Sequence, residues 1–244
     1  MSPTDALAAR LLEASRITVL TGAGVSAASG VPTFRGENGL WRNVRAETLA
    51  TAEAFENDPK LVWEWYDWRR SVIRAAQPNA AHHALAAWTR ARSGVTVITQ
   101  NVDGLHERAG TERLVRLHGS IWRLRCWNHC AGAPSSWEAL TAPLPSLPPR
   151  CPHCDGLARP AVVWFGESLD AADVRAATDA CACDVFITIG TSAIVHPAAS
   201  LLHHARRHHA FTAEINLEPT PASAAVDIAL QGKAEEILGA LLPT

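Results

Sequence analysis

Short runs of apolar and β-branched residues recur along the chain and alternate with alanine-rich stretches. The first run, residues 17–21, follows a segment with leucines at helical spacing behind the capping candidates Thr4 and Asp5. Later runs of this kind lie at residues 95–99, 161–165, 185–189, 211–215 and 226–230. The alanine-rich stretches predict helices at residues 83–92, 171–182, 197–209 and 234–242. Continuous apolar strands that alternate with helices are typical of a parallel sheet covered on both faces. The pattern therefore predicts a doubly wound α/β fold.

Two segments interrupt this alternation. Residues 34–79 have no strand signal but many tryptophans and charged residues, which indicates helices and loops inserted after the first strand. Residues 121–160 hold four clustered cysteines and a proline-rich stretch that cannot lie inside a helix. We expect these two insertions to form one small domain. The large domain would then consist of residues 1–33, 80–120 and 161–244.

Composition excludes several classes of function. The chain carries 22 basic and 24 acidic side chains, so its net charge is −2. No overall field therefore favours nucleic acid or an anionic membrane surface. Apolar runs of about 18 residues, as a membrane span needs, are absent, and the N-terminus lacks the form of a signal peptide. We expect a soluble cytoplasmic monomer with no nucleic-acid or membrane partner.

Four of the six cysteines form two pairs. Cys126 and Cys130 have three residues between them, and Cys151 and Cys154, further along the chain, have two. Thiolates at such spacings can converge tetrahedrally on Zn²⁺, and two pairs complete a closed structural site. Because the chain lacks a secretory signal, metal binding is favoured over disulfides. His129 has two-residue spacing from Cys126 and is the alternative to Cys130 as a ligand.

A glycine-rich loop follows the first predicted strand. Gly22, Gly24 and Ala27 satisfy the relaxed spacing of a dinucleotide-binding loop, in which backbone amides approach a pyrophosphate. The alternative is a tight turn between a strand and a helix. Pro32 interrupts the chain soon afterwards, and no second strand with a terminal acidic residue follows. These departures disfavour a hydride-transferring dehydrogenase.

Polar side chains follow the predicted strand at residues 95–99. Gln100, Asn101 and Asp103 lie at its carboxyl end, where open α/β sheets bind ligands. Their amide and carboxylate groups could hold ribose hydroxyls or a carboxamide, since those groups need paired donors and acceptors. The alternative is a solvated polar loop.

One histidine has a position suited to acid-base chemistry. His118 ends an apolar run, with Gly119 behind it, and a neutral imidazole can accept a proton near pH 7. A histidine at a strand end is also commonly structural. We expect most of the other histidines to be unrelated to chemistry: His82 and His83 lie near a helix start, and His203, His204, His208 and His209 decorate a helix.

The single tyrosine of the chain lies in the tryptophan-rich segment 63–70. We expect this segment to be helical, which puts Tyr66 and Arg69 on one face at positions i and i+3. A phenol beside a guanidinium can bind a carboxylate, because arginine offers a bidentate fork and the hydroxyl adds a third donor. The alternative is a solvated face whose aromatic residues anchor the small domain.

Taken together, the motifs resemble those of the sirtuin family, which are NAD-dependent protein lysine deacylases. The matching stretches span nearly the whole chain in family order: GAGVSAASGVPTFR (22–35), TQNVDGLH (99–106), HGS (118–120), the two cysteine pairs, VVWFGE (162–167), GTS (190–192) and INLEPT (215–220). The resemblance implies a Rossmann-like large domain and a small zinc-bearing domain, with NAD and an acylated lysine of a protein substrate meeting between them. The three-residue spacing between Cys126 and Cys130 departs from the commoner two.

The resemblance also implies a role for each motif. NAD would be consumed: the acyl-lysine amide oxygen attacks C1′ of the nicotinamide ribose and expels nicotinamide. His118, the catalytic base, would then deprotonate a ribose hydroxyl, and the products would be free lysine and O-acyl-ADP-ribose. The substrate backbone would pair as an added strand with Val162, Val163, Trp164 and Phe165, and the four cysteines would bind one structural zinc ion. The NAD-binding residues would be Gly22, Ala23, Gly24, Ser26, Phe34, Arg35, Trp41, Gln100, Asn101, Val102, Asp103, Gly190, Thr191, Ser192, Asn216, Leu217, Glu218 and Ala234.

Within the family, segment 63–70 resembles the branch called class III, in which a Tyr-x-x-Arg pair binds acidic acyl groups. Tyr66 and Arg69 match this pair, and Ala50 matches a small residue that leaves room for a longer acyl chain. The branch implies removal of succinyl, malonyl and glutaryl groups, and also of acetyl. Two alternatives stay open: an enzyme that is mainly a deacetylase, and a mono-ADP-ribosyltransferase that uses the same NAD site.

Overall fold

The computed structural model describes residues 2–33, 40–41, 44–192, 194 and 197–241. Its largest element is a six-stranded sheet in which all neighbouring strands are parallel. In sheet order the strands are β11 (Ile228–Gln231), β10 (Phe211–Asn216), β9 (Val185–Ile189), β1 (Ile17–Thr21), β4 (Val95–Thr99) and β5 (Leu114–Arg116). Numbered within this sheet alone, the order is 6-5-4-1-2-3, which is the order of the doubly wound dinucleotide-binding fold.

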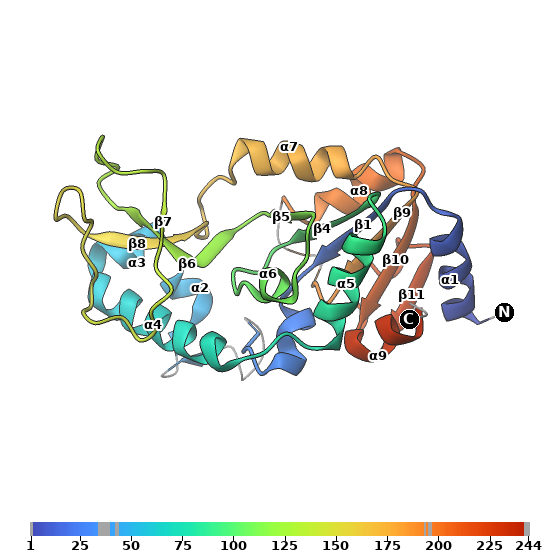
Figure 1. The fold of residues 1–244 in the computed structure, drawn as a ribbon, viewed down its shortest axis with the longest axis horizontal. Coiled ribbons are helices and arrows are strands. Elements are labelled where there is room, and N and C mark those ends of the chain that lie inside the picture. Colours follow the sequence, from blue (N-terminus) through green and yellow to red (C-terminus); the bar gives the residue numbers. More distant parts are fainter. Residues whose placement is uncertain (1, 34–39, 42–43, 193, 195–196, 242–244) are drawn as a thin grey trace.

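Helices cover both faces of this sheet (Figure 1). One face carries α1 (Pro3–Glu13), α5 (Ala80–Ala91) and α9 (Ala234–Leu241), with α6 (Leu105–Ala109) beside α5; the other carries α7 (Ala171–Ala180) and α8 (Ser200–Arg207). Successive strand residues alternate between the two faces. In β9, Val185 and Ile187 pack with α1, α5 and α9, whereas Phe186 packs with α7 and α8. A strand buried on both faces is apolar throughout, which is why the apolar runs predicted these strands.

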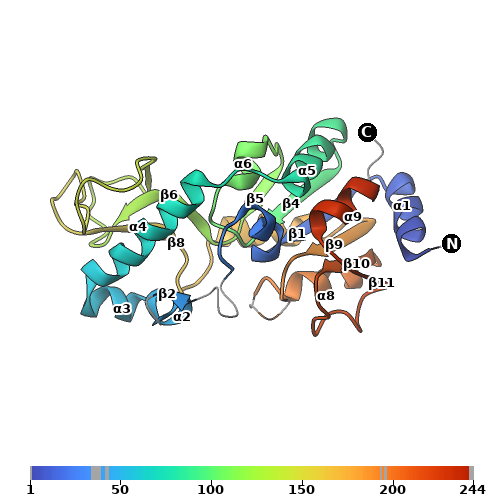
Figure 2. The same ribbon diagram turned by 90° about the horizontal axis from the view of Figure 1, so that it is seen from below.

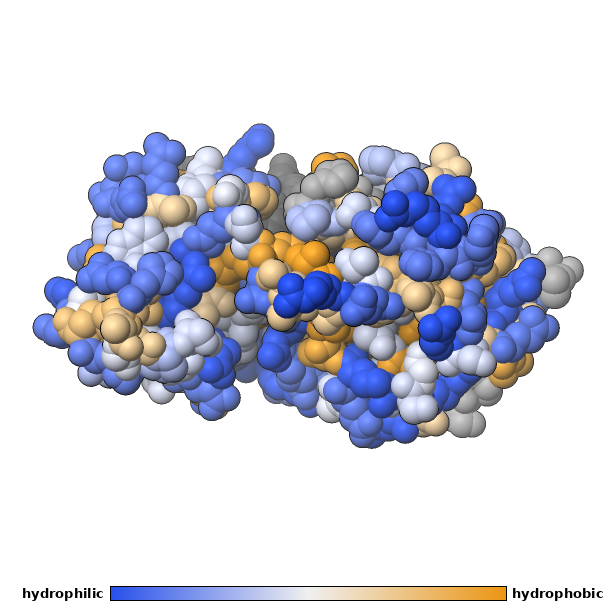
Figure 3. All heavy atoms as spheres, turned by 90° about the horizontal axis from the view of Figure 1, so that it is seen from above, coloured by the Kyte–Doolittle hydropathy of each residue, from blue (hydrophilic) through white to orange (hydrophobic). Residues whose placement is uncertain are grey.

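A second, smaller domain lies at the other end of the molecule (Figures 1 and 2). Its core is aromatic: Phe55, Trp63, Trp65, Tyr66 and Trp164 are each at most 3% exposed and pack together. Figure 3 shows that the molecule narrows between the domains and that hydrophobic residues gather at this waist. The elements of the small domain are the antiparallel sheet of β6 (Gly119–Cys126), β7 (Trp137–Glu138) and β8 (Ala158–Val162), the pair β2 (Leu40–Trp41) and β3 (Val44–Arg45), and helices α2 (Ala46–Leu49), α3 (Ala52–Asn57) and α4 (Pro59–Ala75).

The predicted fold class is confirmed, and the strands expected at 17–21, 95–99 and 185–189 have these limits. The run at 161–165 was wrongly placed in the parallel sheet. Its strand, β8, ends at Val162 and pairs antiparallel with β6. Val162 and Trp164 are buried in the small-domain core, not in the large sheet. Segment 34–79, expected to lack strands, contains β2 and β3.

The first helix begins differently from its prediction. Ser2, not Thr4, caps α1: its hydroxyl accepts the Asp5 N–H, and the Asp5 carboxylate accepts the Ser2 N–H. None of the described helices is long and apolar enough to cross a membrane. The limits predicted for the two domains stay a prediction.

The two halves of the large sheet meet at the loops that follow β1 and β9. The first loop leads into a 3-10 helix, η1 (Ala23–Ser29). A Cβ on Gly24 would lie 2.7 Å from Gly190 Cα, and a Cβ on Gly22 would lie 2.8 Å from the Gly190 carbonyl oxygen. Gly190 has φ +58°, and a Cβ there would lie 2.5 Å from Val25 N. These glycines allow two backbones to touch at the switch between β1 and β9, where such sheets bind ligands.

We expect Gly190→Ala to lower the free energy of unfolding by about 2 kcal/mol or more, because left-handed strain and a backbone clash add. The control is Gly239→Ala in α9, where a Cβ would meet nothing within 4 Å. That change should raise the free energy of unfolding by up to about 1 kcal/mol, since alanine is the better helix former. Urea denaturation measures both values. Equal stability of Gly190→Ala and the wild type would contradict the argument.

Candidate functional site

The carboxyl ends of the strands bring most of the predicted NAD-binding residues to one edge of the large sheet. Gly22, Ala23, Gly24 and Ser26 follow β1; Gln100, Asn101, Val102 and Asp103 follow β4; Gly190, Thr191 and Ser192 follow β9; Asn216, Leu217 and Glu218 lie at the end of β10; and Ala234 begins α9. Trp41 instead packs in the aromatic core of the small domain. Phe34 and Arg35 lie outside the described residues.

Ser26 is the centre of a buried hydrogen-bond network. Its hydroxyl donates to Asp103 Oδ2 at 2.8 Å and accepts from Asn101 Nδ2 at 3.2 Å. His82 Nε2 lies 3.3 Å from the same oxygen, and the Asn79 backbone N–H donates to His82 Nδ1 at 3.3 Å. Because Nδ1 accepts, Nε2 carries the hydrogen of the neutral ring and donates to Ser26. His82 and Asn101 thus both donate to the Ser26 oxygen, and Ser26 in turn donates to the Asp103 carboxylate.

His82, which we expected to be unrelated to chemistry, is therefore part of this site. It is fully buried, and its ring centroid lies 4.9 Å from that of His106, which is hydrogen-bonded to Thr21. Burial lowers the pKa of His82 to about 3 and that of His106 to about 4, so both rings are neutral at pH 7. The sequence did carry a signal: Asn79 and His82 occupy the two positions of a capping box at the start of α5.

Side-chain amides tie the loops after β4, β9 and β10 together. Gln100 Nε2 donates to Thr191 Oγ1 at 2.9 Å, and Asn216 Nδ2 donates to the Thr191 carbonyl oxygen at 2.8 Å. Thr191 is buried, whereas Leu217 and Glu218, next along from Asn216, are exposed. On this side of the sheet edge, hydrogen bonds therefore fix the buried Thr191, while the neighbouring residues Leu217 and Glu218 are open to solvent.

His118 lies between β5 and β6 and faces the same edge. Its Nδ1 lies 2.9 Å from the Gln100 carbonyl oxygen. A carbonyl oxygen only accepts, so Nδ1 carries the hydrogen and Nε2 keeps its lone pair in the neutral ring. Burial lowers the pKa of His118, and the bond to Gln100 opposes this by favouring the charged ring. At pH 7 the side chain is thus neutral and able to accept a proton at Nε2.

The segment predicted to bind the substrate backbone runs beside His118. The Val163 N–H donates to the His118 carbonyl oxygen at 3.0 Å, and the Phe165 N–H donates to the Ala50 carbonyl oxygen at 2.9 Å. The Trp164 N–H donates to Glu167 Oε2 at 2.8 Å. A substrate strand would have to pair with backbone groups of this segment that do not take part in these bonds. The substrate-binding role of Val162, Val163, Trp164 and Phe165 stays a prediction.

Tyr66 and Arg69 lie on one face of α4, and this face is buried, not solvated. Trp164 Nε1 donates to the Tyr66 hydroxyl at 2.8 Å, and the Arg69 guanidinium carbon lies 5.2 Å from the Trp65 ring centroid. Burial raises the pKa of Tyr66 to about 12 and lowers the pKa of Arg69. The charge of Arg69 opposes the rise in the Tyr66 pKa, and Tyr66 and Asp103 oppose the fall in the Arg69 pKa. The phenol therefore stays protonated beside a charged guanidinium.

Another face of α4 fixes the helix to the loop that contains the proline-rich stretch. Asp67 Oδ1 accepts the Leu144 N–H at 2.8 Å. The Arg70 guanidinium, fully buried, donates to three backbone carbonyl oxygens, those of Ile121, Ala139 and Thr141. These bonds hold α4 at a set position against β6 and the following loop, and with it Tyr66 and Arg69.

One small pocket joins Arg69 to the sheet edge. It is lined by Arg69 together with Ala23, Ser26, Val31, Pro32, Asn101, Val102 and Asp103. A larger hollow of about 350 Å³ lies at the opposite edge, between α1 and the starts of β9 and β10. Its carboxylates Asp184 and Asp227 already accept backbone N–H groups. Ser26, Arg69, Asn101 and Asp103 thus meet at the smaller pocket.

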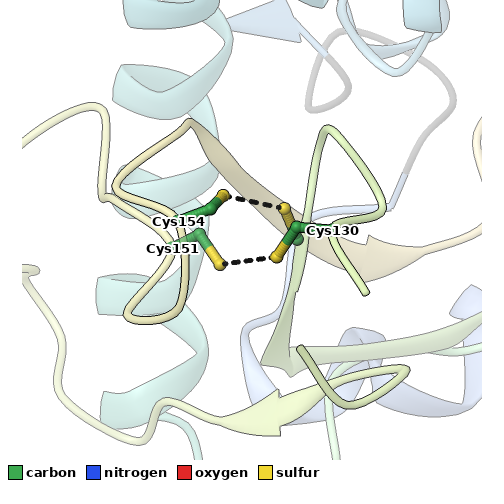
Figure 4. A group of neighbouring side chains, drawn as sticks. Cys130, Cys151 and Cys154 are labelled. Atoms are coloured by element: carbon green, nitrogen blue, oxygen red, sulfur yellow. Dashed lines mark hydrogen bonds between the residues drawn. The ribbon is translucent and has the colours of Figure 1, made fainter. Parts of the chain in front are cut away.

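The four predicted cysteines converge at the far end of the small domain. Cys126 ends β6, and Cys151 and Cys154 precede β8. All four sulfur atoms lie within 4.8 Å of one another, with Sγ to Sγ distances of 3.6 Å between Cys126 and Cys154 and 3.8 Å between Cys130 and Cys151. A tetrahedron with Zn–S bonds of about 2.3 Å has edges of about 3.8 Å. Figure 4 shows Cys130, Cys151 and Cys154 pointing towards one another. The donor set fits a structural zinc ion, and Cys130, not His129, belongs to it.

We expect each chain to contain one zinc ion, which can be measured by inductively coupled plasma mass spectrometry. Chelation should lower the thermal midpoint, because a closed four-thiolate site binds only the folded chain. Returning zinc should restore the midpoint, and magnesium, a hard ion that prefers oxygen ligands, should not. A zinc content near zero in stable, folded protein would contradict the four-ligand interpretation.

Comparisons with known proteins agree with this architecture. The model of the Sir2 family matches residues 22–197. The chain is 48% identical over 224 residues to a protein of Aquifex aeolicus named NAD-dependent protein deacylase, covering 91% of this chain and 92% of that protein. It is 49% identical over 236 residues to NAD-dependent protein deacylase 2 of Pyrobaculum aerophilum, covering 96% and 93%.

Solved structures give the same result. A Sir2 homologue in complex with NAD superposes with a TM-score of 0.90 at 44% identity, covering 97% of this chain and 91% of that one. A Sir2 protein with a p53 peptide and NAD⁺ superposes with a TM-score of 0.84 at 28% identity, covering 98% and 96%. The chain belongs to the Sir2 family, the sirtuins, and is an NAD-dependent protein deacylase.

Proposed function

We propose that this deacylase removes acidic acyl groups, namely succinyl, malonyl and glutaryl, from lysine side chains, in addition to acetyl. The observation that carries the proposal is the buried pair of Tyr66 and Arg69 on α4, beside the pocket formed with Asn101 and Asp103. The acyl chain of a bound substrate would lie between this pair and the NAD site.

The energetic argument starts from the cost of burying Arg69. A deacetylase needs only an apolar slot for a methyl group, and a guanidinium in such a slot carries a desolvation penalty. The carboxylate of a succinyl or malonyl group would offset that penalty by accepting from the guanidinium and from the Tyr66 hydroxyl. Ala50, whose carbonyl oxygen accepts the Phe165 N–H, adds a short side chain beside the substrate segment and so leaves length for the acyl chain.

The residues at the sheet edge fit NAD as the second substrate. When bound, NAD supplies an electrophilic ribose carbon and nicotinamide as a leaving group. The backbone of Gly22, Ala23 and Gly24 would approach the phosphates, and Asp103, held by Ser26, would hold the carboxamide. Asn101 would help to position the nicotinamide half, while Thr191 and Asn216 would hold the adenosine half. The zinc ion would stay remote from these steps, since thiolates fill all four of its positions.

His118 would act as the base that removes a proton from the ribose. Its Nδ1 is fixed on the Gln100 carbonyl oxygen, so Nε2 would take the proton of a ribose hydroxyl. That hydroxyl would then attack the carbon of the former amide, and water would complete the release of free lysine and O-acyl-ADP-ribose. A mono-ADP-ribosyltransferase would instead leave ADP-ribose on protein, which the masses of the products distinguish.

We expect Arg69→Met to lower kcat/KM for a succinyl-lysine peptide by about 10- to 100-fold, the usual effect of losing a charge-assisted hydrogen bond. Activity on the matching acetyl-lysine peptide should change little, because its methyl group makes no such bond. The control is Arg74→Met, on the same helix but exposed, which should leave both activities unchanged. Equal losses on the two peptides would assign Arg69 a structural role only.

We expect kcat/KM to stay constant as the pH drops to about 6.5, the ordinary pKa of histidine, and to fall only at lower pH. Burial lowers the pKa of His118, so its active, neutral form persists somewhat below this pH and is lost as the pH falls through the lowered value. His118→Tyr should reduce deacylation by about 100-fold or more while the circular dichroism spectrum is unchanged. Near wild-type activity in this variant would remove His118 as the base.

A further inference from the structure

The hydrogen bond between Trp164 and Tyr66 fixes the direction of the Tyr66 hydroxyl. An indole N–H can only donate, so the Tyr66 oxygen must accept from Trp164 Nε1, 2.8 Å away. The hydroxyl hydrogen is then turned away from the indole. Among the described residues none accepts that hydrogen, although Tyr66 is only 3% exposed. A buried donor without an acceptor is costly, and an acceptor brought by the substrate would remove the cost.

Two further contacts hold Trp164 in place. Its backbone N–H donates to Glu167 Oε2, and the guanidinium carbon of Arg159 lies 3.3 Å from the centroid of its indole ring. Arg159 is 2% exposed and is fixed in turn by an ion pair with Glu167 and by a 2.9 Å bond to the Val162 carbonyl oxygen. The indole cannot rotate without breaking this arrangement, so the donor that faces Tyr66 has a fixed position.

The charges around Tyr66 favour an anion near its hydroxyl group. Arg69, one turn along α4, and Arg159, behind the indole, both act on the phenol as positive charges. Glu167 also acts on Tyr66, but it is bound to Arg159 and Arg125 and to the Trp164 N–H. Arg69 is therefore the charge that a carboxylate near the Tyr66 hydroxyl would meet.

We propose that Trp164 is a positioning residue for acyl selectivity: by occupying the acceptor side of the Tyr66 hydroxyl, its indole N–H directs the hydroxyl hydrogen to the carboxylate of an acidic acyl group. The inference rests on the proposed function of Tyr66 and Arg69. It adds a specific role for the Trp164 side chain, distinct from the backbone pairing predicted for the same residue.

The test is Trp164→Phe, which removes the N–H but keeps an aromatic ring beneath Arg159. We expect the ratio of kcat/KM for succinyl-lysine peptide to kcat/KM for acetyl-lysine peptide to fall about fivefold, the effect of one net hydrogen bond, mainly through a higher KM for the succinyl-lysine peptide. The matched control is Trp63→Phe. It removes another buried indole N–H, which donates to the Ala158 carbonyl oxygen, and should not change the ratio of the two activities.

A double-mutant cycle separates positioning from general damage. If Trp164 acts through Tyr66, the double variant Trp164→Phe/Tyr66→Phe should be no worse on succinyl-lysine peptide than Tyr66→Phe alone. Additive losses, or equal losses on succinyl and acetyl peptides, would overturn the inference while leaving the proposed function intact. A wild-type enzyme without measurable activity on succinyl-lysine peptide would overturn both.

The single tyrosine of the chain allows a direct readout. Tyrosine labelled with ¹³C at Cζ gives one NMR signal, from Tyr66. We expect succinyl-lysine peptide, but not acetyl-lysine peptide, to shift this signal in the wild type, and the shift to be smaller in Trp164→Phe. Equal shifts by succinyl-lysine peptide in the two proteins would show that the indole does not direct the hydroxyl.

Discussion

The close contact of two backbones at the centre of the large sheet is the constraint on which the rest of the site depends. The loop after β1 can touch the loop after β9 only because Gly22, Gly24 and Gly190 lack side chains. Their contact sets the place where the strand order reverses and a crevice opens at the carboxyl edge. Ser26 and Thr191, next along these two loops, are thereby brought within reach of the Asn101 and Gln100 side chains.

Most of the polar groups placed there hold hydrogen bonds in fixed directions and do not change their protonation state near pH 7. His82 and His106 are buried and neutral, so they contribute hydrogen-bond direction without adding positive charge. His118 differs because its burial is less complete and its Nδ1 is anchored on a carbonyl oxygen, which leaves Nε2 as a base. The buried hydrogen bonds of Ser26 with His82, Asn101 and Asp103 make this network rigid, and such rigidity suits a site that must hold a dinucleotide in one orientation.

The small domain places the acyl-binding face. Helix α4 carries Tyr66 and Arg69 on one side and Asp67 and Arg70 on another, and the second pair binds backbone groups of the cysteine-containing insertion. The two insertions in the sequence thus depend on each other, since buried residues of both form one core. A polar pair can be kept in an aromatic core because the helix that presents it is held on its other side.

The sequence by itself determined the class of the fold, the strands of the large sheet and the family motifs, because these follow from local pattern: a strand buried on both faces must be apolar throughout, and a cysteine pair must have ligand spacing. The tertiary structure alone decided that the strand ending at Val162 pairs with β6 and not with the parallel sheet, that His82 joins Ser26 and that Cys130 joins the cluster. Periodicity reports that a residue is buried but not which partners bury it. The direction of the Tyr66 hydroxyl could likewise not be predicted from the sequence, since it is set by Trp164, 98 residues away along the chain.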